Sequence, residues 1–159
     1  MKRKRTAPTH SHESSTTGRV AELFLGSILL SNGFEVYSPM VDVAIDCLAI
    51  SPRGSQLRFQ CKSRSKQDAT VFDLSLPKDK RATLPTHVFY MRGPADRAEY
   101  WIVPFPVVKR YTKRSKGRTG RVIYRLYLTE ESRRALRDYR NEDGVKEVIR
   151  WKGNKSQSA

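Results

Sequence analysis

The chain has 159 residues, enough for one domain, and its 31 Lys and Arg against 16 Asp and Glu give a formal net charge of +15. This excess predicts a polyanionic partner, because fixed positive charge attracts phosphates and releases counterions when they bind. The longest apolar stretch is interrupted by Glu22, and the N-terminus lacks the apolar segment of a secretory signal, so we expect a cytoplasmic protein without a membrane span.

The first predicted element is a helix over about residues 17–31. Residues 1–16 are basic and rich in Ser and Thr, without apolar periodicity, and are predicted to form a disordered tail. A Thr at the start of the helix and an Asn-Gly pair after its end can act as caps. Apolar residues cover almost its whole circumference, which predicts burial on all sides. Glu22 lies among them without an obvious polar neighbour, which is unusual for a solvated glutamate.

A hairpin is predicted next. Residues 34–37 form a short strand, and two longer strands follow over residues 43–50 and 56–63. Residues 51–55, Ser-Pro-Arg-Gly-Ser, have the composition of a turn. The two longer strands are therefore expected to pair with each other in antiparallel fashion.

Three polar residues on this hairpin point to chemistry. Asp46 lies on its first strand, and the alternation of side chains puts Gln60 and Lys62 on one face of its second strand. If the hairpin closes symmetrically about Arg53, Asp46 falls opposite Gln60, with Cβ atoms roughly 5 Å apart. At that separation the two side chains can share one cation.

The remaining pattern predicts a single α+β (mixed α/β) domain built around a central sheet. We expect the core over residues 17–128 and a helical extension with a polar tail over residues 129–159. The later predicted elements are a loop over 66–73, a short extended or helical piece over 72–76, strands over 87–91 and 100–103, a basic loop over 109–120, a strand over 121–128, a helix capped by Thr129 and ending near Tyr139, and a short helix over about 145–151.

The segment from Lys109 to Arg125 contains eight cations and no acid, with two tyrosines between them. Ordinary protein surfaces mix both signs of charge, so this segment predicts a contact with nucleic acid. The alternative is a solvated charged loop. The candidate nucleic-acid-binding residues are Lys109, Arg110, Lys113, Arg114, Lys116, Arg118 and Arg121.

Two cysteines, Cys47 and Cys61, lie on the predicted hairpin. Their spacing does not match a zinc site, and we expect buried, reduced thiols. The residues around them are suited to a harder metal. Mg²⁺ (or Mn²⁺) takes oxygen ligands, and one or two carboxylates are enough when a substrate phosphate completes the site. The candidate ligands are the carboxylates of Glu22 and Asp46, the side-chain carbonyl of Gln60 and the backbone carbonyl of Cys61.

A metal held in this way could activate a water and neutralise a phosphate oxygen during phosphodiester hydrolysis. Lys62 can orient the attacking water or hold the phosphate. A helical Glu, then an Asp, then Gln-x-Lys on a hairpin resembles the core of the PD-(D/E)XK nuclease superfamily. The likeness covers residues 18–63 well and residues 72–104 more loosely. Within the superfamily, the Gln-x-Lys form is similar to group I intron homing endonucleases, and the short core is similar to archaeal Holliday-junction resolvases.

The resemblance implies a restriction-endonuclease-like mixed β-sheet flanked by helices, and a Mg²⁺-dependent DNA endonuclease. Its implied catalytic residues are Glu22, Asp46, Gln60 and Lys62. Gln60 stands where such enzymes usually have an acid, so the site carries one negative charge fewer. The sequence has no literal Pro-Asp pair, and Asp42 is a rival or helper for Asp46.

The resemblance implies DNA as the partner, and cutting both strands requires two active sites, so we expect a homodimer or a higher homo-oligomer. The location expected is the cytoplasm, associated with the nucleoid when DNA is bound. Two alternatives remain open. One is a catalytically inactive nucleic-acid-binding protein with a nuclease-like fold, and the other is a basic structural protein associated with RNA.

Overall fold

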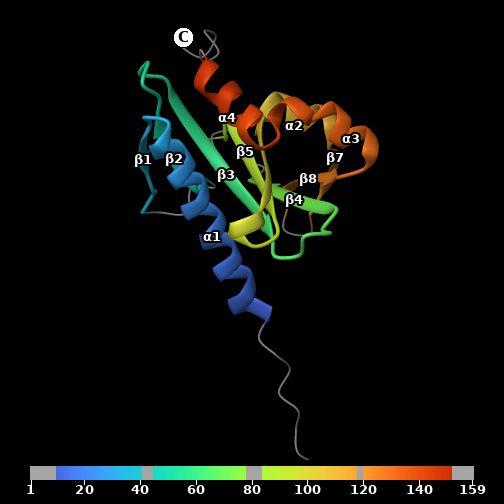
Figure 1. The fold of residues 1–159 in the computed structure, drawn as a ribbon. Helices are drawn as coiled ribbons and strands as arrows, with labels where there is room; N and C mark the ends of the chain where they lie inside the picture. The colour runs from blue at the N-terminus through green and yellow to red at the C-terminus, as the bar shows by residue number, and fades with distance from the viewer. Residues whose placement is uncertain (1–9, 41–44, 78–83, 118–119, 152–159) are drawn as a thin grey trace, which may run out of the picture.

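The computed structural model describes residues 10–40, 45–77, 84–117 and 120–151. The predicted fold class is confirmed, because a mixed central sheet is flanked by helices (Figure 1). All neighbouring strands of this sheet are antiparallel except β3 and β5, which run parallel. The five strands lie in the order β1 (Glu35–Tyr37), β2 (Cys47–Ile50), β3 (Gln56–Arg64), β5 (His87–Arg92) and β6 (Glu99–Pro104).

A second, three-stranded antiparallel sheet packs beside the first. Its order is β4 (Val71–Leu76), β8 (Val122–Tyr127) and β7 (Lys113–Lys116). The expectation of a basic loop over residues 109–120 is therefore wrong in part. Residues 105–111 form helix α2 (Phe105–Tyr111), which has a Pro in its first turn, and β7 takes its backbone partners from β8.

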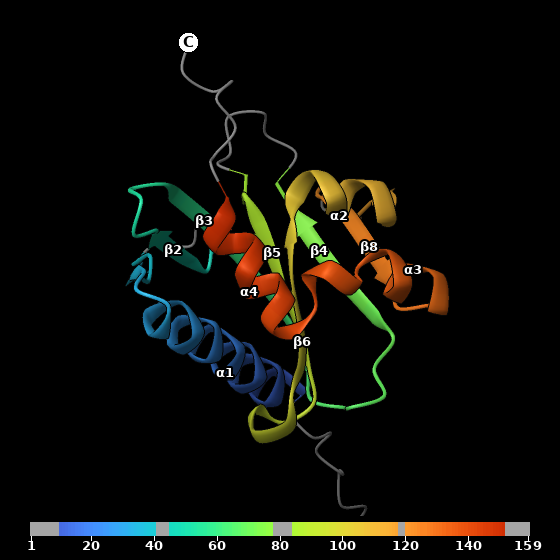
Figure 2. The same ribbon diagram turned by 45° about the horizontal axis from the view of Figure 1, so that its top comes forward.

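Helices cover both faces of the central sheet. Helix α1 (His10–Ser31) and helix α4 (Asn141–Arg150) lie over one face, as Figure 2 shows. The second sheet and α2 lie over the other face, close to helix α3 (Glu130–Ala135). Two short 3-10 helices, η1 (Ala95–Arg97) and η2 (Arg137–Tyr139), complete the described elements.

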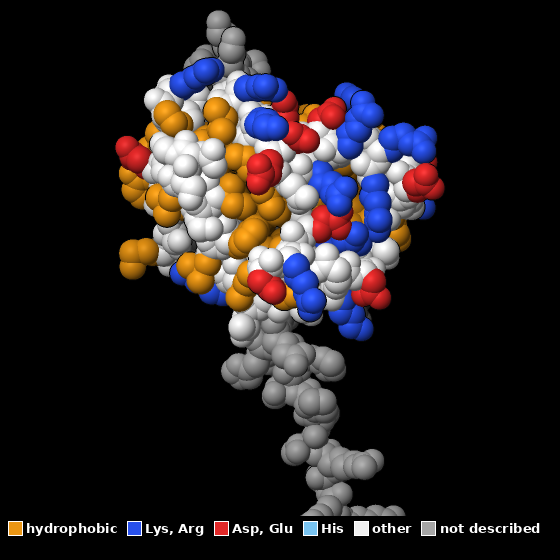
Figure 3. All heavy atoms as spheres, viewed as in Figure 1, with side chains coloured by type: hydrophobic (Ala, Val, Ile, Leu, Met, Phe, Trp, Pro, Cys, Tyr) orange, Lys and Arg blue, Asp and Glu red, His pale blue; other side chains and the backbone are white. Residues whose placement is uncertain are grey.

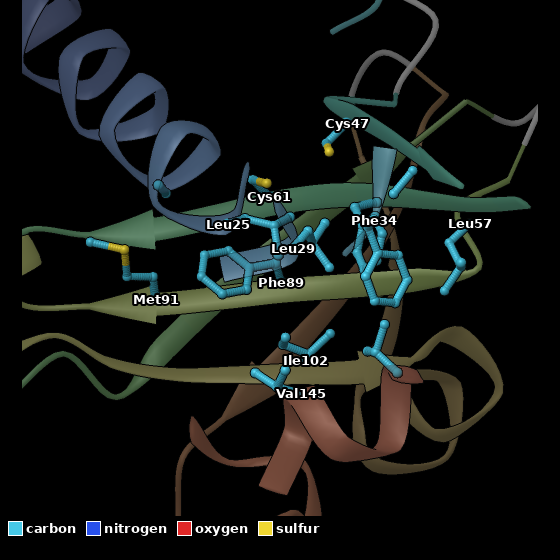
Figure 4. Packing of buried hydrophobic residues seen from close by; sticks show 14 residues of the cluster. Leu25, Leu29, Phe34, Cys47, Leu57, Cys61, Phe89, Met91, Ile102 and Val145 are labelled. Atoms are coloured by element: carbon cyan, nitrogen blue, oxygen red, sulfur yellow. The ribbon is translucent and has the colours of Figure 1, made fainter. Parts of the chain in front are cut away.

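Each face of the sheet has its own hydrophobic core. In Figure 4, Leu25 and Leu29 of α1 point toward Phe89 of β5, which also meets Ile102 and Val145. On the opposite face, Val88 and Tyr90 of β5 pack against residues of the second sheet. All residues of β5 are buried because this strand lies between β3 and β6 and is covered on both faces.

The prediction that the first helix is buried on all sides is wrong. Ala21, Leu25 and Leu29, spaced four residues apart, are fully buried, but Leu23 and Leu30 are each 60% exposed. The helix therefore lies on the surface of the sheet and buries one stripe. It also begins at His10 rather than near residue 17, so the helical backbone includes residues 10–16 of the expected tail. No helix in the described part of the chain has both the length and the apolar character needed to cross a membrane.

The C-terminal elements differ in their bounds from those predicted. The Thr129 cap is confirmed, because its side chain accepts a hydrogen bond from the backbone N–H of Ser132. The helix that follows ends at Ala135 and gives way to η2, so it is shorter than expected. Helix α4 begins at Asn141, earlier than predicted, and carries acids in its first turn, where the helix dipole favours them.

The buried His87, at the start of β5, predicts a pH-dependent stability. Its ring packs against Phe59 and Trp151, with centroids 5.5 and 4.8 Å away, and burial lowers the pKa of His87 to about 3. The unfolded chain binds a proton near the ordinary value of 6.5, so the stabilising effect of the neutral ring is complete above pH 6.5 and is lost as pH falls toward 3.

We expect the free energy of unfolding to decrease by about 1.4 kcal/mol for each pH unit across that window. Urea unfolding at a series of pH values measures this slope. The His87→Gln chain, which lacks the titrating ring, should show a shallower slope than the natural chain. Equal slopes in the two proteins would contradict the prediction.

Candidate active site

The hairpin closes in the register that the sequence predicts. Cys47 pairs with Phe59 and Ile50 pairs with Gln56, a register that puts Asp46 opposite Gln60. Asp46 itself lies just before β2 and not within the strand, contrary to the prediction. Its backbone N–H still donates to the carbonyl of Phe59 at 2.9 Å, so Asp46 continues the line of the hairpin.

The carboxylate of Asp46 is held by the neighbouring strand. Its Oδ2 accepts hydrogen bonds from the backbone N–H of Cys61 at 2.7 Å and from Nε2 of Gln60 at 3.1 Å. Burial raises the pKa of Asp46, although the Cys61 N–H bond and the charge of Lys62 act in the opposite direction. The site thus keeps a carboxylate fixed in position in surroundings that disfavour its charge.

Gln60 is buried, with 6% of its surface exposed, and the oxygen of its side-chain amide, Oε1, has no hydrogen-bond partner among the described residues. Leaving a buried acceptor unpaired costs about 1–3 kcal/mol. Because Oε1 belongs to the same amide whose Nε2 donates to Asp46, this unpaired acceptor lies close to the Asp46 carboxylate. A hard cation is the kind of ligand that such a pair of oxygen groups fits.

Lys62 and Glu22 both act on Asp46 through their charges. The Lys62 ammonium lowers the pKa of Asp46 and the Glu22 carboxylate raises it. Helix α1 therefore brings Glu22 into the electrostatic surroundings of Asp46, and β3 does the same with Lys62. These two residues come from elements far apart in the sequence.

The expectation that Glu22 lacks polar company is wrong. Nη1 of Arg19, one helical turn earlier, donates to Oε2 of Glu22 at 2.7 Å, and the Glu22 side chain is 27% exposed. Any cation that recruits Glu22 must compete with this ion pair. Across the described ranges, no three His, Cys, Asp or Glu side chains form a metal-binding group, so an oxygen site here needs Gln60 or backbone carbonyls as well.

Cys47 and Cys61 are free, buried thiols, as expected. Burial raises the pKa of Cys47 to about 12, and it raises the pKa of Cys61 as well. Both sulfurs therefore stay protonated near neutral pH, which makes them poor metal ligands and nucleophiles. Cys61 contributes to the site through its backbone N–H, and a role for its carbonyl stays a prediction. Asp42 lies outside the described residues.

The candidate nucleic-acid-binding residues are distributed over a helix and an edge strand. Lys109 and Arg110 lie in the last turn of α2, and Arg121 lies just before β8. Lys113, Arg114 and Lys116 lie on the exposed edge strand β7. Figure 3 shows Lys and Arg side chains gathered on the side of the molecule where Figure 1 places β4, β7 and β8. Arg118 lies outside the described residues.

Two further polar residues form a pair that the sequence did not indicate, although Arg125 was counted among the cations of the basic segment. Asp73 on β4 binds Arg125 on β8 through two hydrogen bonds, and Arg64 at the end of β3 acts on Asp73 by its charge. Asp73 and Arg125 are 52 residues apart in the sequence. The pairing of β4 with β8 brings them together, and no local pattern indicates that pairing.

Comparison with known proteins supports a class of fold rather than a family. No family model matches the chain, and a search of curated proteins found no match. Among solved structures, the chain is similar to a bacterial homing endonuclease, I-Ssp6803I, with a TM-score of 0.57 and 16% sequence identity. The match covers 86% of this chain and 91% of that chain. The chain therefore has a nuclease-like fold.

Proposed function

We propose that this protein is a divalent-metal-dependent DNA endonuclease of the PD-(D/E)XK type, which works with Mg²⁺ or Mn²⁺. The observation that carries the proposal is the buried, unpaired Oε1 of Gln60 beside the fixed carboxylate of Asp46. The likeness of fold to a bacterial homing endonuclease supports it, and so does the net charge of +15, which favours a polyanionic substrate.

In this proposal, Asp46 and Gln60 would hold the metal with side-chain oxygens, and the carbonyl of Cys61 and the carboxylate of Glu22 would complete the protein ligands. When bound, the cation would supply Lewis acid chemistry that lowers the pKa of an attacking water and neutralises a phosphate oxygen. The Cys61 N–H keeps the Asp46 carboxylate in place. The positive charge of Lys62 acts on the same carboxylate, and it would attract the scissile phosphate or orient the water.

Cutting both strands of a duplex needs two such sites, so we propose that the working form is a homodimer or a higher homo-oligomer. The proposed class includes homing-type enzymes, which cut duplexes, and resolvase-type enzymes, which cut junctions. A protein of this class would work in the cytoplasm, on the DNA of the nucleoid.

A second candidate function is a nucleic-acid-binding protein without catalytic activity. Two observations favour it: Gln60 provides a neutral amide in place of an acid, and Glu22 is already paired with Arg19. Both reduce the negative charge available to hold a cation. This candidate predicts binding that weakens with salt and yields no product.

A cleavage assay separates the two candidates. The purified chain is incubated with duplex, four-way-junction and single-stranded DNA, each with Mg²⁺, with Mn²⁺ and with a chelator. We expect products only with a divalent cation. Binding to these DNAs without product under any condition would favour the inactive candidate, and preferential binding to structured RNA in competition with duplex DNA would favour the RNA-associated alternative.

A further inference from the structure

The outward face of the three-stranded sheet carries polar side chains that the proposed active site does not use. Side chains alternate along each strand, and Phe72, Leu74 and Leu126 point into the core beneath the sheet. The register then puts another set of residues on the outer face. These are Asp73, Ser75, Lys113, Ser115, Ile123 and Arg125.

Asp73 and Arg125 form a bidentate ion pair at the centre of this face. Nε of Arg125 donates to Oδ1 of Asp73 at 2.6 Å, and Nη2 donates to Oδ2 at 2.8 Å. The side chains remain 43% exposed for Arg125 and 35% for Asp73, so both stay within reach of a ligand. Tyr127, two residues beyond Arg125 on β8, lies on the same outer face. The guanidinium is thus held in one orientation while part of it faces outward.

A carboxylate is unexpected at this place. All residues of the three strands are described, and Asp73 is their only acid against four cations, which are Lys113, Arg114, Lys116 and Arg125. Exposed ion pairs add little to stability. If these cations bound phosphate, the Asp73 carboxylate among them would weaken that binding, because its negative charge repels phosphate. Asp73 could instead fix the plane and direction of the Arg125 guanidinium. An arginine that recognises a base edge needs its guanidinium oriented in this way.

The dimensions of the sheet suit the major groove of duplex DNA. The major groove is about 12 Å wide and admits a two-stranded ribbon, and the paired strands β4 and β8, which carry Asp73 and Arg125, form such a ribbon. The outer face adjoins the strand that carries the candidate active site. Arg64, two residues beyond Lys62 on β3, donates from Nε to the carbonyl of Val71 on β4 at 3.1 Å. Arg64 therefore connects the end of β3 to β4, and its charge acts on Asp73 of the outer face.

We propose that Arg125 reads a guanine edge in the major groove of duplex DNA and that Asp73 is the positioning residue that orients it. This inference rests on the proposed function, because it takes DNA as the substrate. It assigns sequence preference to the outer face of the three-stranded sheet, whereas Lys109 and Arg110 of α2 would contact only phosphates.

The test uses the full-length Asp46→Asn chain, so that the DNA is bound without being consumed. A library of randomised duplexes is selected for binding, and the enriched site is then titrated against an unrelated duplex at several salt concentrations. The same titrations are made after adding Arg125→Lys, Asp73→Asn or the control Arg53→Lys. Lysine keeps the charge and loses the planar fork, which separates base reading from phosphate contact.

We expect Arg125→Lys to lose about tenfold to a hundredfold in affinity for the enriched site, with affinity for the unrelated duplex and the salt dependence unchanged. Asp73→Asn should broaden the preference at the same base pair, an effect that loss of sheet stability alone would not produce. Arg53→Lys, in the exposed turn between β2 and β3, should leave the preference intact.

Other results overturn the inference in distinguishable ways. If neither duplex nor four-way-junction DNA is bound, the proposed function fails together with the inference. If junctions are bound and duplexes are not, the inference alone fails. If duplexes are bound and no sequence is enriched, or if Arg125→Lys leaves the preference intact, DNA remains the substrate and the reading role is wrong. If Arg125→Lys weakens binding to both duplexes equally, Arg125 contacts phosphate instead.

Discussion

Replacing Asp46 by Asn should reduce the rate of DNA cleavage by about a thousandfold or more and leave the fold intact. The amide oxygen of Asn can still accept the hydrogen bond from the Cys61 N–H, so the local structure is preserved. The side chain loses the charge that would hold a divalent cation. A loss of several kcal/mol in transition-state stabilisation corresponds to a rate decrease of this size.

Lys62→Met should reduce cleavage as well, because the positive charge beside the Asp46 carboxylate disappears while the aliphatic stem remains. Asp96→Asn is the matched control, since Asp96 is an exposed acid on η1. Initial cleavage rates in Mg²⁺ and thermal unfolding curves are measured for all four proteins, including the natural chain. If the Asp46 and Lys62 variants cleave DNA at the rate of the natural chain, the proposed active site is wrong, even if the protein has a nuclease-like fold.

The second large effect is expected at Gly144, in the first turn of α4. A Cβ atom at this position would lie 2.3 Å from the carbonyl oxygen of Tyr139 and 3.3 Å from the backbone nitrogen of Ile102. Both contacts are with backbone, which cannot swing aside as a flexible side chain can. α4 would have to move away from β6, and Val145 and Val148, which the helix buries in the first core, would move with it.

We therefore expect Gly144→Ala to lower the free energy of unfolding by about 3 kcal/mol or more, measured by urea unfolding. Gly18→Ala is the matched control. Gly18 lies in α1, where an added Cβ would have no neighbouring atom within 4 Å, and alanine favours a helix over glycine by up to about 1 kcal/mol. The control should be neutral or slightly stabilising. Similar small changes in both variants would mean that α4 can shift at little cost.

Local patterns were sufficient for the fold class and for the centre of the candidate site. Alternation along the two strands and a five-residue turn determine which residues of a hairpin face each other, and these features are adjacent in the sequence. The pairing of Asp46 with Gln60 was therefore predictable. The cap at Thr129 is also a local interaction, spanning three residues, and it too was predictable.

Features that depend on distant partners could not be predicted in the same way. The apolar circumference of α1 suggested burial on all sides, but a helix buries only the stripe that meets another element, and the sequence does not say how many elements cover it. The basic segment after α2 looked like a loop because its residues are polar. It forms a strand because β8 supplies the backbone partners, which requires no apolar side chains.

The sequence by itself determined the net charge, the hairpin register and the position of Asp46 opposite Gln60. Tertiary structure alone decided that Glu22 approaches Asp46 while it is paired with Arg19, and that Asp73 meets Arg125. The physical reason is the distance along the sequence between the residues that each interaction joins. Hydrogen bonding and side-chain alternation within a hairpin act between near neighbours, whereas helix packing and the pairing of separate strands depend on how the whole chain excludes water from its two cores.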